Sequence, residues 1–238
     1  MAATVVGIAT LPPAGAGRQW RTWLRPAEID ACRERGDPAL HLAARYAAKR
    51  ACLALIGWPG PAGDLDIEVV GMERDRPRLV LDGAVAEWAQ RSAPPRFDVS
   101  LSHTVRYAGA MVVGAPRCGF DLLDVRRWEL ALSRSGRALV ERITGPAERV
   151  HDAQAGVDSS RRSAARFAIK ECVVKAIGGL PRGGSFHDIE VVFDACERPH
   201  VFLRGAVASG QVVIEEVTTT TSPDLLVASV IGKGTADG

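Results

Sequence analysis

The sequence has few of the features that mark a disulfide-linked or zinc-binding protein. Its 238 residues include only five cysteines, and no two of them form a C-x-x-C pair. An odd number of widely spaced cysteines argues against both a disulfide framework and a structural zinc site, and it suits a reducing compartment. The five are Cys32, Cys52, Cys118, Cys172 and Cys196.

The sequence also lacks a strong charge of either sign and a long apolar run. The formal net charge is +2 and only 5% of the residues are aromatic, so the composition does not favour a nucleic-acid binder. Residues 1–16 lack the basic start of a secretory signal, and no apolar run approaches about 18 residues, the length that spans a bilayer. We therefore expect a cytoplasmic globular protein without nucleic-acid or membrane partners.

The most strongly patterned stretch is 165–178. Its apolar residues at 165, 168, 169, 172, 173 and 176 have helical spacing and leave one polar edge. Glu171 and Lys175 lie on that edge, four residues apart, so their side chains are neighbours. Gly178 and Gly179 predict the end of the helix. Taken alone, such a pair can be a surface ion pair worth about 0.3 kcal/mol.

The rest of the chain alternates between strand and helix patterns. A chain of this kind is typical of an α+β protein. Strands are predicted at 4–10, 66–70, 77–81, 99–104, 107–113 and 119–125, and further helices at 27–34, 39–56 and 83–91.

The chain contains an internal repeat. Four segments of the first half recur in the second half, 121 or 122 residues later: 66–70 as 188–192 (DIEVV in both), 76–77 as 198–199 (RP in both), 83–86 as 205–208 (GAVA in both), and 43–57 as 164–178 in part. Two copies of one α+β unit, spanning residues 1–115 and 116–238, are the simplest explanation.

Each copy keeps reactive side chains that the other lacks. This is expected if two related units pack about a pseudo-twofold axis and only one cleft between them is active. The predicted fold is therefore α+β, with two similar halves and an active cleft between them. The differing pairs are Asp121 against Ala9, Glu171 against Arg50, Lys175 against Ala54, and His103 against Thr221.

Asp121 lies in an apolar strand (119–125, GFDLLDV), where an unpaired carboxylate is costly. Together with Glu171 it could hold Mg²⁺, which takes oxygen ligands and typically uses one or two carboxylates plus substrate phosphates. Lys175 could meet the same phosphates as a point charge. Asp124 lies an odd number of residues from Asp121, so a regular strand would point it to the opposite face.

Other polar residues each have two interpretations. His103 could donate to a phosphate, or it could be a half-buried histidine bonded to the backbone. Cys172 could be a nucleophile, but its apolar neighbours favour a core thiol. Arg126, Arg127 and Trp128 could form a basic rim with an aromatic anchor for a protein partner, or they could be ordinary surface. The basic residues Arg45, Lys49, Arg50 and Arg76 could bind a second phosphate or be solvated.

Together these motifs resemble the 4'-phosphopantetheinyl transferase superfamily. The similarity covers most of the chain from about residue 39 to 232. Two motifs are most similar to the small, trimeric holo-acyl-carrier-protein synthases, whereas the length and the duplicated plan resemble the larger single-chain members, which are pseudo-dimers. A monomer is therefore expected. The motifs are 119–127 and 166–178, followed by 188–192, with the serine-histidine strand 99–104 and Tyr107-Ala108.

Members of that superfamily transfer 4'-phosphopantetheine from coenzyme A to a serine of a carrier protein and release adenosine 3',5'-bisphosphate. The resemblance implies that Asp121 and Glu171 are Mg²⁺ ligands and that Glu171 helps deprotonate the serine, directly or through water. The remaining implied contacts with coenzyme A are Lys175, His103 and the adjacent Ser102 around the diphosphate, and Arg45, Lys49 and Arg76 at the 3'-phosphate.

The sequence departs from the larger members at one position. They usually have a second acid two residues after the aspartate, where this chain has Leu123, with Asp124 next as in the small members. Water would then be the third ligand of the metal. Two other functions stay open: a non-catalytic protein that binds coenzyme A or a carrier protein with the same fold, and a binder of nucleic acid or other acidic ligands.

Overall fold

The computed structural model describes residues 5–10, 20–61, 64–71, 76–92, 96–114, 117–155, 159–208 and 212–234. The chain divides into two compact units, here called unit 1 (residues 1–118) and unit 2 (residues 119–238), and each is described by itself. The boundary predicted from the repeat, between 115 and 116, lies three residues before this division. Within the described ranges, no helix combines the length and the apolarity needed to cross a membrane.

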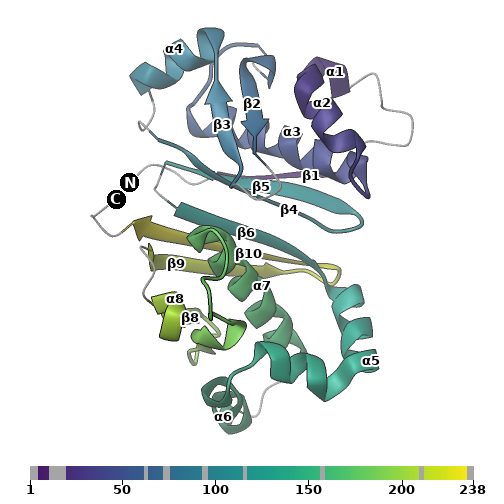
Figure 1. The fold of residues 1–238 in the computed structure, drawn as a ribbon, viewed down its shortest axis with the longest axis vertical. Helices are drawn as coiled ribbons and strands as arrows, with labels where there is room; N and C mark the ends of the chain where they lie inside the picture. Colours follow the sequence, from purple (N-terminus) through teal and green to yellow (C-terminus); the bar gives the residue numbers. More distant parts are fainter. Residues whose placement is uncertain are drawn as a thin grey trace. The chain divides into compact units, whose positions relative to one another are not determined.

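Unit 1 is built on a three-stranded sheet with the order β1-β5-β4. Strands β1 (Val5–Thr10) and β4 (Asp98–His103) both pair antiparallel with the central strand β5 (Tyr107–Val113). The long helix α3 (Pro38–Leu55) packs on this sheet, mainly against β5 (Figure 1). The smaller elements are α1 (Trp20–Trp23), α2 (Pro26–Arg33), the hairpin of β2 (Ile67–Val70) and β3 (Arg78–Leu81), and α4 (Gly83–Ser92).

Unit 2 repeats this plan. Its sheet has the order β6-β10-β9, and helix α7 (Ser159–Ile177) packs against the central strand β10 (Leu225–Gly234) (Figure 1). Strand β9 (Val212–Thr221) is antiparallel to β10. The other elements are β6 (Arg117–Asp124), α5 (Val125–Ile143), α6 (Pro146–Ala155), the hairpin of β7 (Ile189–Phe193) and β8 (Pro199–Leu203), and α8 (Gly205–Ala208).

Corresponding turns support the alignment of the two copies. The amide of Thr104 donates to the carbonyl oxygen of Tyr107 at 2.7 Å between β4 and β5, and the amide of Ser222 donates to that of Leu225 at 2.8 Å between β9 and β10. Thr104 and Ser222 therefore occupy equivalent positions in the two units. The residues directly before them, His103 and Thr221, are equivalent as well. The pseudo-twofold arrangement of the two units stays a prediction.

Helix α7 confirms the pattern analysis. All six of its predicted apolar positions are buried, at 9% exposure or less. The helix ends at Ile177, and Gly178 and Gly179 follow it with φ of +85° and +114°. Only glycine adopts such angles without strain, which explains why this pair ends the helix.

The strands and helices predicted up to residue 125 agree with the structure to within two residues at each end, whereas α7 begins at Ser159, six residues before the predicted stretch 165–178. Strands β9 and β10 and the short helix α1 are not among the predicted elements. No helix is predicted between 125 and 155, where α5 and α6 lie. Helix α5 is interrupted at Gly136, where φ is +44°, but its apolar residues keep helical spacing and lie in or against the core of unit 2, so the sequence did contain a signal for this helix: Val125, Trp128, Leu132, Leu139 and Ile143. Thr4, assigned to the first strand from the sequence, lies outside the described residues.

Candidate functional site

The candidate site in unit 2 depends on how closely helix α7 approaches strand β6. A Cβ atom built at Gly119 would lie 1.8 Å from the carbonyl oxygen of Cys172. No side chain fits at that distance, so only glycine allows this contact. The contact is two residues from Asp121 in the strand and one residue from Glu171 in the helix, and it therefore sets the spacing of the two acids.

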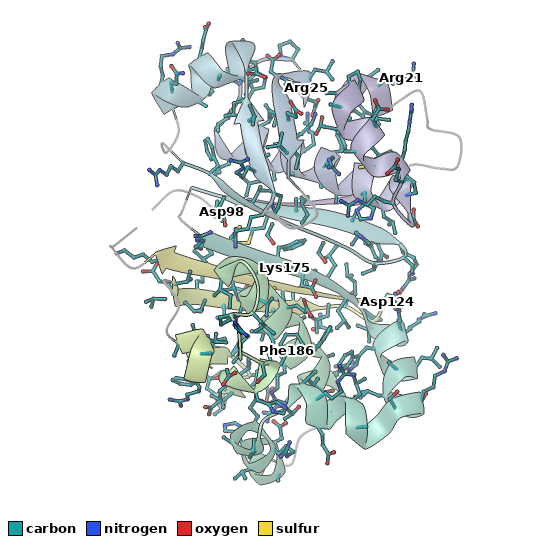
Figure 2. The ribbon with its side chains drawn as sticks, viewed as in Figure 1. Arg21, Arg25, Asp98, Asp124, Lys175 and Phe186 are labelled. Carbon is teal, nitrogen blue, oxygen red and sulfur yellow. The ribbon has the colours of Figure 1, made fainter. Side chains whose placement is uncertain are left out.

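Asp121 and Lys175 form the polar centre of this site. The Nζ of Lys175 donates to Oδ1 of Asp121 and to the carbonyl oxygen of Phe120, both at 2.8 Å. Asp121 is 9% exposed, whereas the Lys175 side chain, labelled in Figure 2, is 30% exposed. The carboxylate is thus paired, as its apolar strand requires, and the side chain of Lys175 is partly exposed to solvent.

Glu171 belongs to the same site. Burial raises the pKa of Glu171 above its ordinary value, the negative charge of Asp121 raises it further, and Lys175 partly opposes both. A divalent cation stabilises such a pair of neighbouring carboxylates, since its charge offsets their repulsion. The structure therefore brings together Asp121, Glu171 and Lys175 as the sequence predicts.

The third acid of the strand motif has a structural role. Asp124 begins helix α5, and its Oδ1 accepts a hydrogen bond from the amide of Arg127 at 3.0 Å (Figure 2). Leu123, where larger members have an acid, is buried at 7% exposure. Across the described ranges, no three His, Cys, Asp or Glu side chains gather as a potential metal cluster. Two carboxylates are what this part of the chain offers a cation.

The corresponding place in unit 1 has a different character. Helix α3 has Arg50 where α7 has Glu171, and Ala54 where α7 has Lys175. The Arg50 side chain is 52% exposed, with Nη1 at 3.7 Å from Oδ2 of Asp64. This position presents a cation instead of an acid, so it cannot ligate a metal.

His103 and Ser102 lie at the end of β4 in unit 1. His103 is exposed and its ring packs edge-to-face on that of His41, with 4.7 Å between centroids, whereas Ser102 is buried. Burial lowers the pKa of His41, and the nearby His103 lowers it further. Because His103 belongs to unit 1 and the acids to unit 2, its contact with the same ligand stays a prediction.

Lys49 lies in the interior of unit 1. It is 0% exposed, and its Nζ donates to Oε2 of Glu28 at 2.5 Å and to the carbonyl oxygens of Trp23 and Asp64 at 3.0 and 2.9 Å. Burial lowers the pKa of Lys49, which the hydrogen bond with Glu28 opposes. All three donors of the ammonium group are used, so this geometry argues against the predicted contact with a 3'-phosphate and assigns Lys49 to the scaffold.

Arg45 and Arg76 are also engaged inside unit 1. Arg45 is 3% exposed and its Nη1 donates to Sγ of Cys32 at 2.8 Å, although its Nε has no hydrogen-bond partner among the described residues. Arg76 is partly exposed and pairs with Asp98 through Nη2 at 2.5 Å. Burial raises the pKa of Asp98, and the charge of Arg76 opposes that shift. Their nucleotide contacts stay predictions.

Unit 2 contains the same buried arrangement as unit 1. The Nζ of Lys170 donates to Oε2 of Glu148 at 2.8 Å and to the carbonyl oxygens of Ile143 and Phe186 at 2.6 and 3.0 Å. Lys170 is 0% and Glu148 1% exposed. Neither glutamate is among the residues predicted from the sequence. A signal existed, because Glu28 and Glu148 are 120 residues apart, close to the offset of the repeat.

Comparison with known proteins identifies the family. A model of the 4'-phosphopantetheinyl transferase superfamily matches residues 117–229. A holo-(acyl-carrier-protein) synthase of Frankia alni is 42% identical over 91 residues, which are 38% of this chain and 70% of the relative. Another, of Vibrio cholerae, is 33% identical over 117 residues, which are 48% of this chain and 90% of the relative. The chain belongs to the 4'-phosphopantetheinyl transferase superfamily.

A search of solved structures gives matches of similar extent. One is the crystal structure of a holo-(acyl-carrier-protein) synthase from Bacillus anthracis in complex with CoA (3',5'-ADP), with 29% identity and a TM-score of 0.40; the match covers 50% of this chain and 96% of that one. The family match begins at residue 117 and so contains Asp121, Glu171 and Lys175 but none of the predicted residues of unit 1. The roles predicted in unit 1 therefore rest only on the resemblance of its own motifs to the superfamily.

The predicted docking rim of this superfamily member needs a correction. Trp128 is 7% exposed and stacks on Phe167, with 5.1 Å between ring centroids, and its Nε1 donates to Oγ of Ser163 at 3.3 Å. It is a core residue, so both interpretations of Trp128, as an anchor for a partner and as ordinary surface, are wrong. Arg126 is exposed and forms an ion pair with Asp224 at 2.9 Å. The helical spacing of Trp128 from Val125 and Leu132, which also pack against the core, was the sequence signal for an inward direction.

The cysteines give a direct test of this core. Burial raises the pKa of Cys52 to about 12 and raises the pKa of Cys172 well above its ordinary value. Only the thiolate is nucleophilic, so buried thiols with a raised pKa react slowly at pH 8. We expect iodoacetamide to modify one thiol of the native protein rapidly, the exposed Cys196, and the four buried ones only after unfolding in urea. Mass spectrometry of the labelled protein checks this, and a second rapidly labelled thiol would contradict the burial. Cys172 is thus a core thiol, as its neighbours predict.

Proposed function

We propose that the protein transfers 4'-phosphopantetheine from coenzyme A to a serine of a carrier protein and releases adenosine 3',5'-bisphosphate. The observation that carries this proposal is the cluster of Asp121, Glu171 and Lys175 inside the segment that matches the superfamily. The relatives are named holo-(acyl-carrier-protein) synthases, which supports the same activity for this chain. We further propose that the protein acts as a cytoplasmic monomer and needs no nucleic acid.

Asp121 and Glu171 would hold a Mg²⁺ ion. The two carboxylates fit the ion because Asp121 is close enough for its negative charge to raise the pKa of Glu171, and because Mg²⁺ commonly takes one or two carboxylates plus substrate phosphates. When bound, the ion would neutralise negative charge on the diphosphate of coenzyme A. Water would complete its coordination, since Asp124 caps helix α5 and Leu123 is apolar.

The protein's own side chains would then accept the serine proton and bind the diphosphate. In the reaction the serine oxygen bonds to the β-phosphorus of coenzyme A, the bond from that phosphorus to the oxygen bridging to the α-phosphate breaks, and Glu171 accepts the serine proton, directly or through water. Lys175 would place its positive charge on the diphosphate instead of on Asp121. His103, with Ser102, would hold the same diphosphate from unit 1. Positioning and charge neutralisation supply most of the acceleration in phosphoryl transfer.

A mass-spectrometric assay tests the proposal. The full chain is incubated with coenzyme A, Mg²⁺ and a panel of apo carrier proteins from fatty acid, polyketide and peptide synthesis. The expected result is a gain of one phosphopantetheine group on the serine of at least one carrier. Absence of any gain, together with measurable binding of coenzyme A in calorimetry, would instead support the non-catalytic binding protein that Leu123 suggests.

A further inference from the structure

Glu148 connects three separate segments of unit 2 through one carboxylate. Its Oε2 accepts hydrogen bonds from Nζ of Lys170 at 2.8 Å and from the amide of Gly145 at 2.6 Å, and its Oε1 accepts one from the amide of Val191 at 2.7 Å. The Nε of Arg166 lies 3.2 Å from Oε1. The side chain is 1% exposed, so every one of these bonds is shielded from water.

Lys170 extends this network to the ends of two more segments. Its other two hydrogen bonds reach the carbonyl oxygen of Ile143, the last residue of α5, and that of Phe186, which begins a short 3₁₀ helix (Phe186–Asp188). Helix α7 is thereby fixed at one side chain to α5, α6 and the segment before β7. A helix held in this way cannot turn about its own axis without breaking several buried hydrogen bonds.

The rotation of α7 determines where its reactive groups point. Lys170 directly precedes Glu171, and successive helical residues are rotated by about 100°. A turn of α7 by about 10° would move a group about 6 Å from the axis by about 1 Å. Metal-ligand distances tolerate only about 0.2 Å. The hydrogen bonds that hold Lys170 therefore also determine where the side chains of Glu171 and Lys175 lie, because all three residues rotate together with α7.

We propose that Glu148 is a positioning residue for the metal site: by holding Lys170 it fixes the rotation of α7 and directs Glu171 and Lys175 toward Asp121. This inference rests on the proposed function of that site. The network is shared by both units, but only α7 carries the acid and the lysine. Unit 1 therefore supplies a matched control, in which Glu28 accepts from Lys49, from the amide of Arg25 at 2.9 Å and from that of Val69 at 3.1 Å.

The experiment compares Glu148→Gln with Glu28→Gln in the full chain. Glutamine has nearly the same size as glutamate but carries no charge. Each substitution therefore removes the negative charge from one buried glutamate–lysine pair, Glu148 with Lys170 in unit 2 or Glu28 with Lys49 in unit 1. Mn²⁺ binding, measured by electron paramagnetic resonance without coenzyme A, reports on the metal site independently of activity. We expect the Mn²⁺ dissociation constant to rise about tenfold in Glu148→Gln, as is typical when a residue that orients a ligand is changed, and to stay within about twofold of wild type in Glu28→Gln.

A double variant separates positioning from general stability. In Glu148→Gln/Lys170→Met the buried charge is removed as well, which should restore part of the thermal stability lost in Glu148→Gln. If Glu148 positions α7, Mn²⁺ binding stays weak in the double variant although stability recovers. Recovery of Mn²⁺ affinity along with stability would overturn the proposal, as would equal weakening in Glu28→Gln. Transfer to a carrier protein by the wild type is measured separately, so its absence would count against the proposed function and not against the positioning.

Discussion

Replacing Asp121 or Glu171 by alanine is expected to lower kcat for phosphopantetheine transfer at least about 10³-fold, which corresponds to about 4 kcal/mol of lost transition-state stabilisation. Each substitution removes one of the two carboxylates that would hold Mg²⁺, and the loss of charge neutralisation falls on the reacting diphosphate. Asp121 is 9% exposed, and its partner Lys175 can turn toward solvent, so the fold should survive. Steady-state transfer to an apo carrier protein, with circular dichroism to confirm folding, checks the result.

Asp124→Ala is the matched control for this pair. Asp124 belongs to the same strand motif but caps helix α5 through the amide of Arg127. Its removal should cost about 1 kcal/mol of unfolding free energy and change kcat by less than about fivefold. Chelation of divalent ions from the wild type should reproduce the loss seen in Asp121→Ala, and added Mg²⁺ should restore activity. Unchanged turnover in both alanine variants would end the metal hypothesis.

Gly119→Ala is expected to lower the free energy of unfolding by about 3 kcal/mol and to reduce transfer sharply. A Cβ atom at this position would lie 1.8 Å from the carbonyl oxygen of Cys172, so helix α7 would have to move away from β6. The obstacle is a backbone atom, and no change of side-chain rotamer can relieve it. Because Glu171 precedes Cys172, the displacement also separates Glu171 from Asp121. Urea denaturation followed by fluorescence and the transfer assay measure both effects.

Gly36→Ala provides the comparison. A Cβ atom at Gly36 would have no heavy atom within 4 Å, and the position carries no unusual backbone angle. It should leave stability and transfer within error of the wild type. If Gly119→Ala is equally silent, the close approach of helix and strand is not what holds the two acids together.

The spacing of apolar residues in the sequence was enough to predict burial where that burial depends on the periodicity of a single helix or strand. The six apolar positions of α7 are all buried, and Gly178 and Gly179 end it, because helical spacing and glycine chemistry act over a few residues. The proximity of Asp121, Glu171 and Lys175 could also be predicted from the sequence, because the repeat showed that all three residues are replaced in the other copy. The placement of His103 relative to them depends on both units and could not be derived from pattern alone.

The residues that pattern misjudged have partners far away in the chain. Lys49 was expected to be available to a phosphate, yet its carboxylate partner Glu28 lies 21 residues earlier in another helix. Trp128 was interpreted either as part of a docking rim or as ordinary surface, but its stacking partner Phe167 belongs to α7, which is distant in sequence. For Trp128 the helical spacing from Val125 and Leu132 did indicate the inward direction. A single charged residue such as Lys49 has no such pattern. Its burial is decided by whichever distant group reaches it, and a single sequence does not show this.

The paired networks around Lys49 and Lys170 limit how a duplicated chain can change. Loss of Glu28 or Glu148 leaves a buried ammonium ion without its counter-charge, whatever the chemistry of that unit. Ala54, in contrast, stands where the other copy has Lys175, and no hydrogen bond of the interior depends on its side chain. After a duplication, amino-acid substitutions are therefore tolerated at the reactive positions, such as 54 and 175, and disfavoured at the buried glutamates and lysines. In a protein of this kind, comparing the chain with itself separates the two sets of residues.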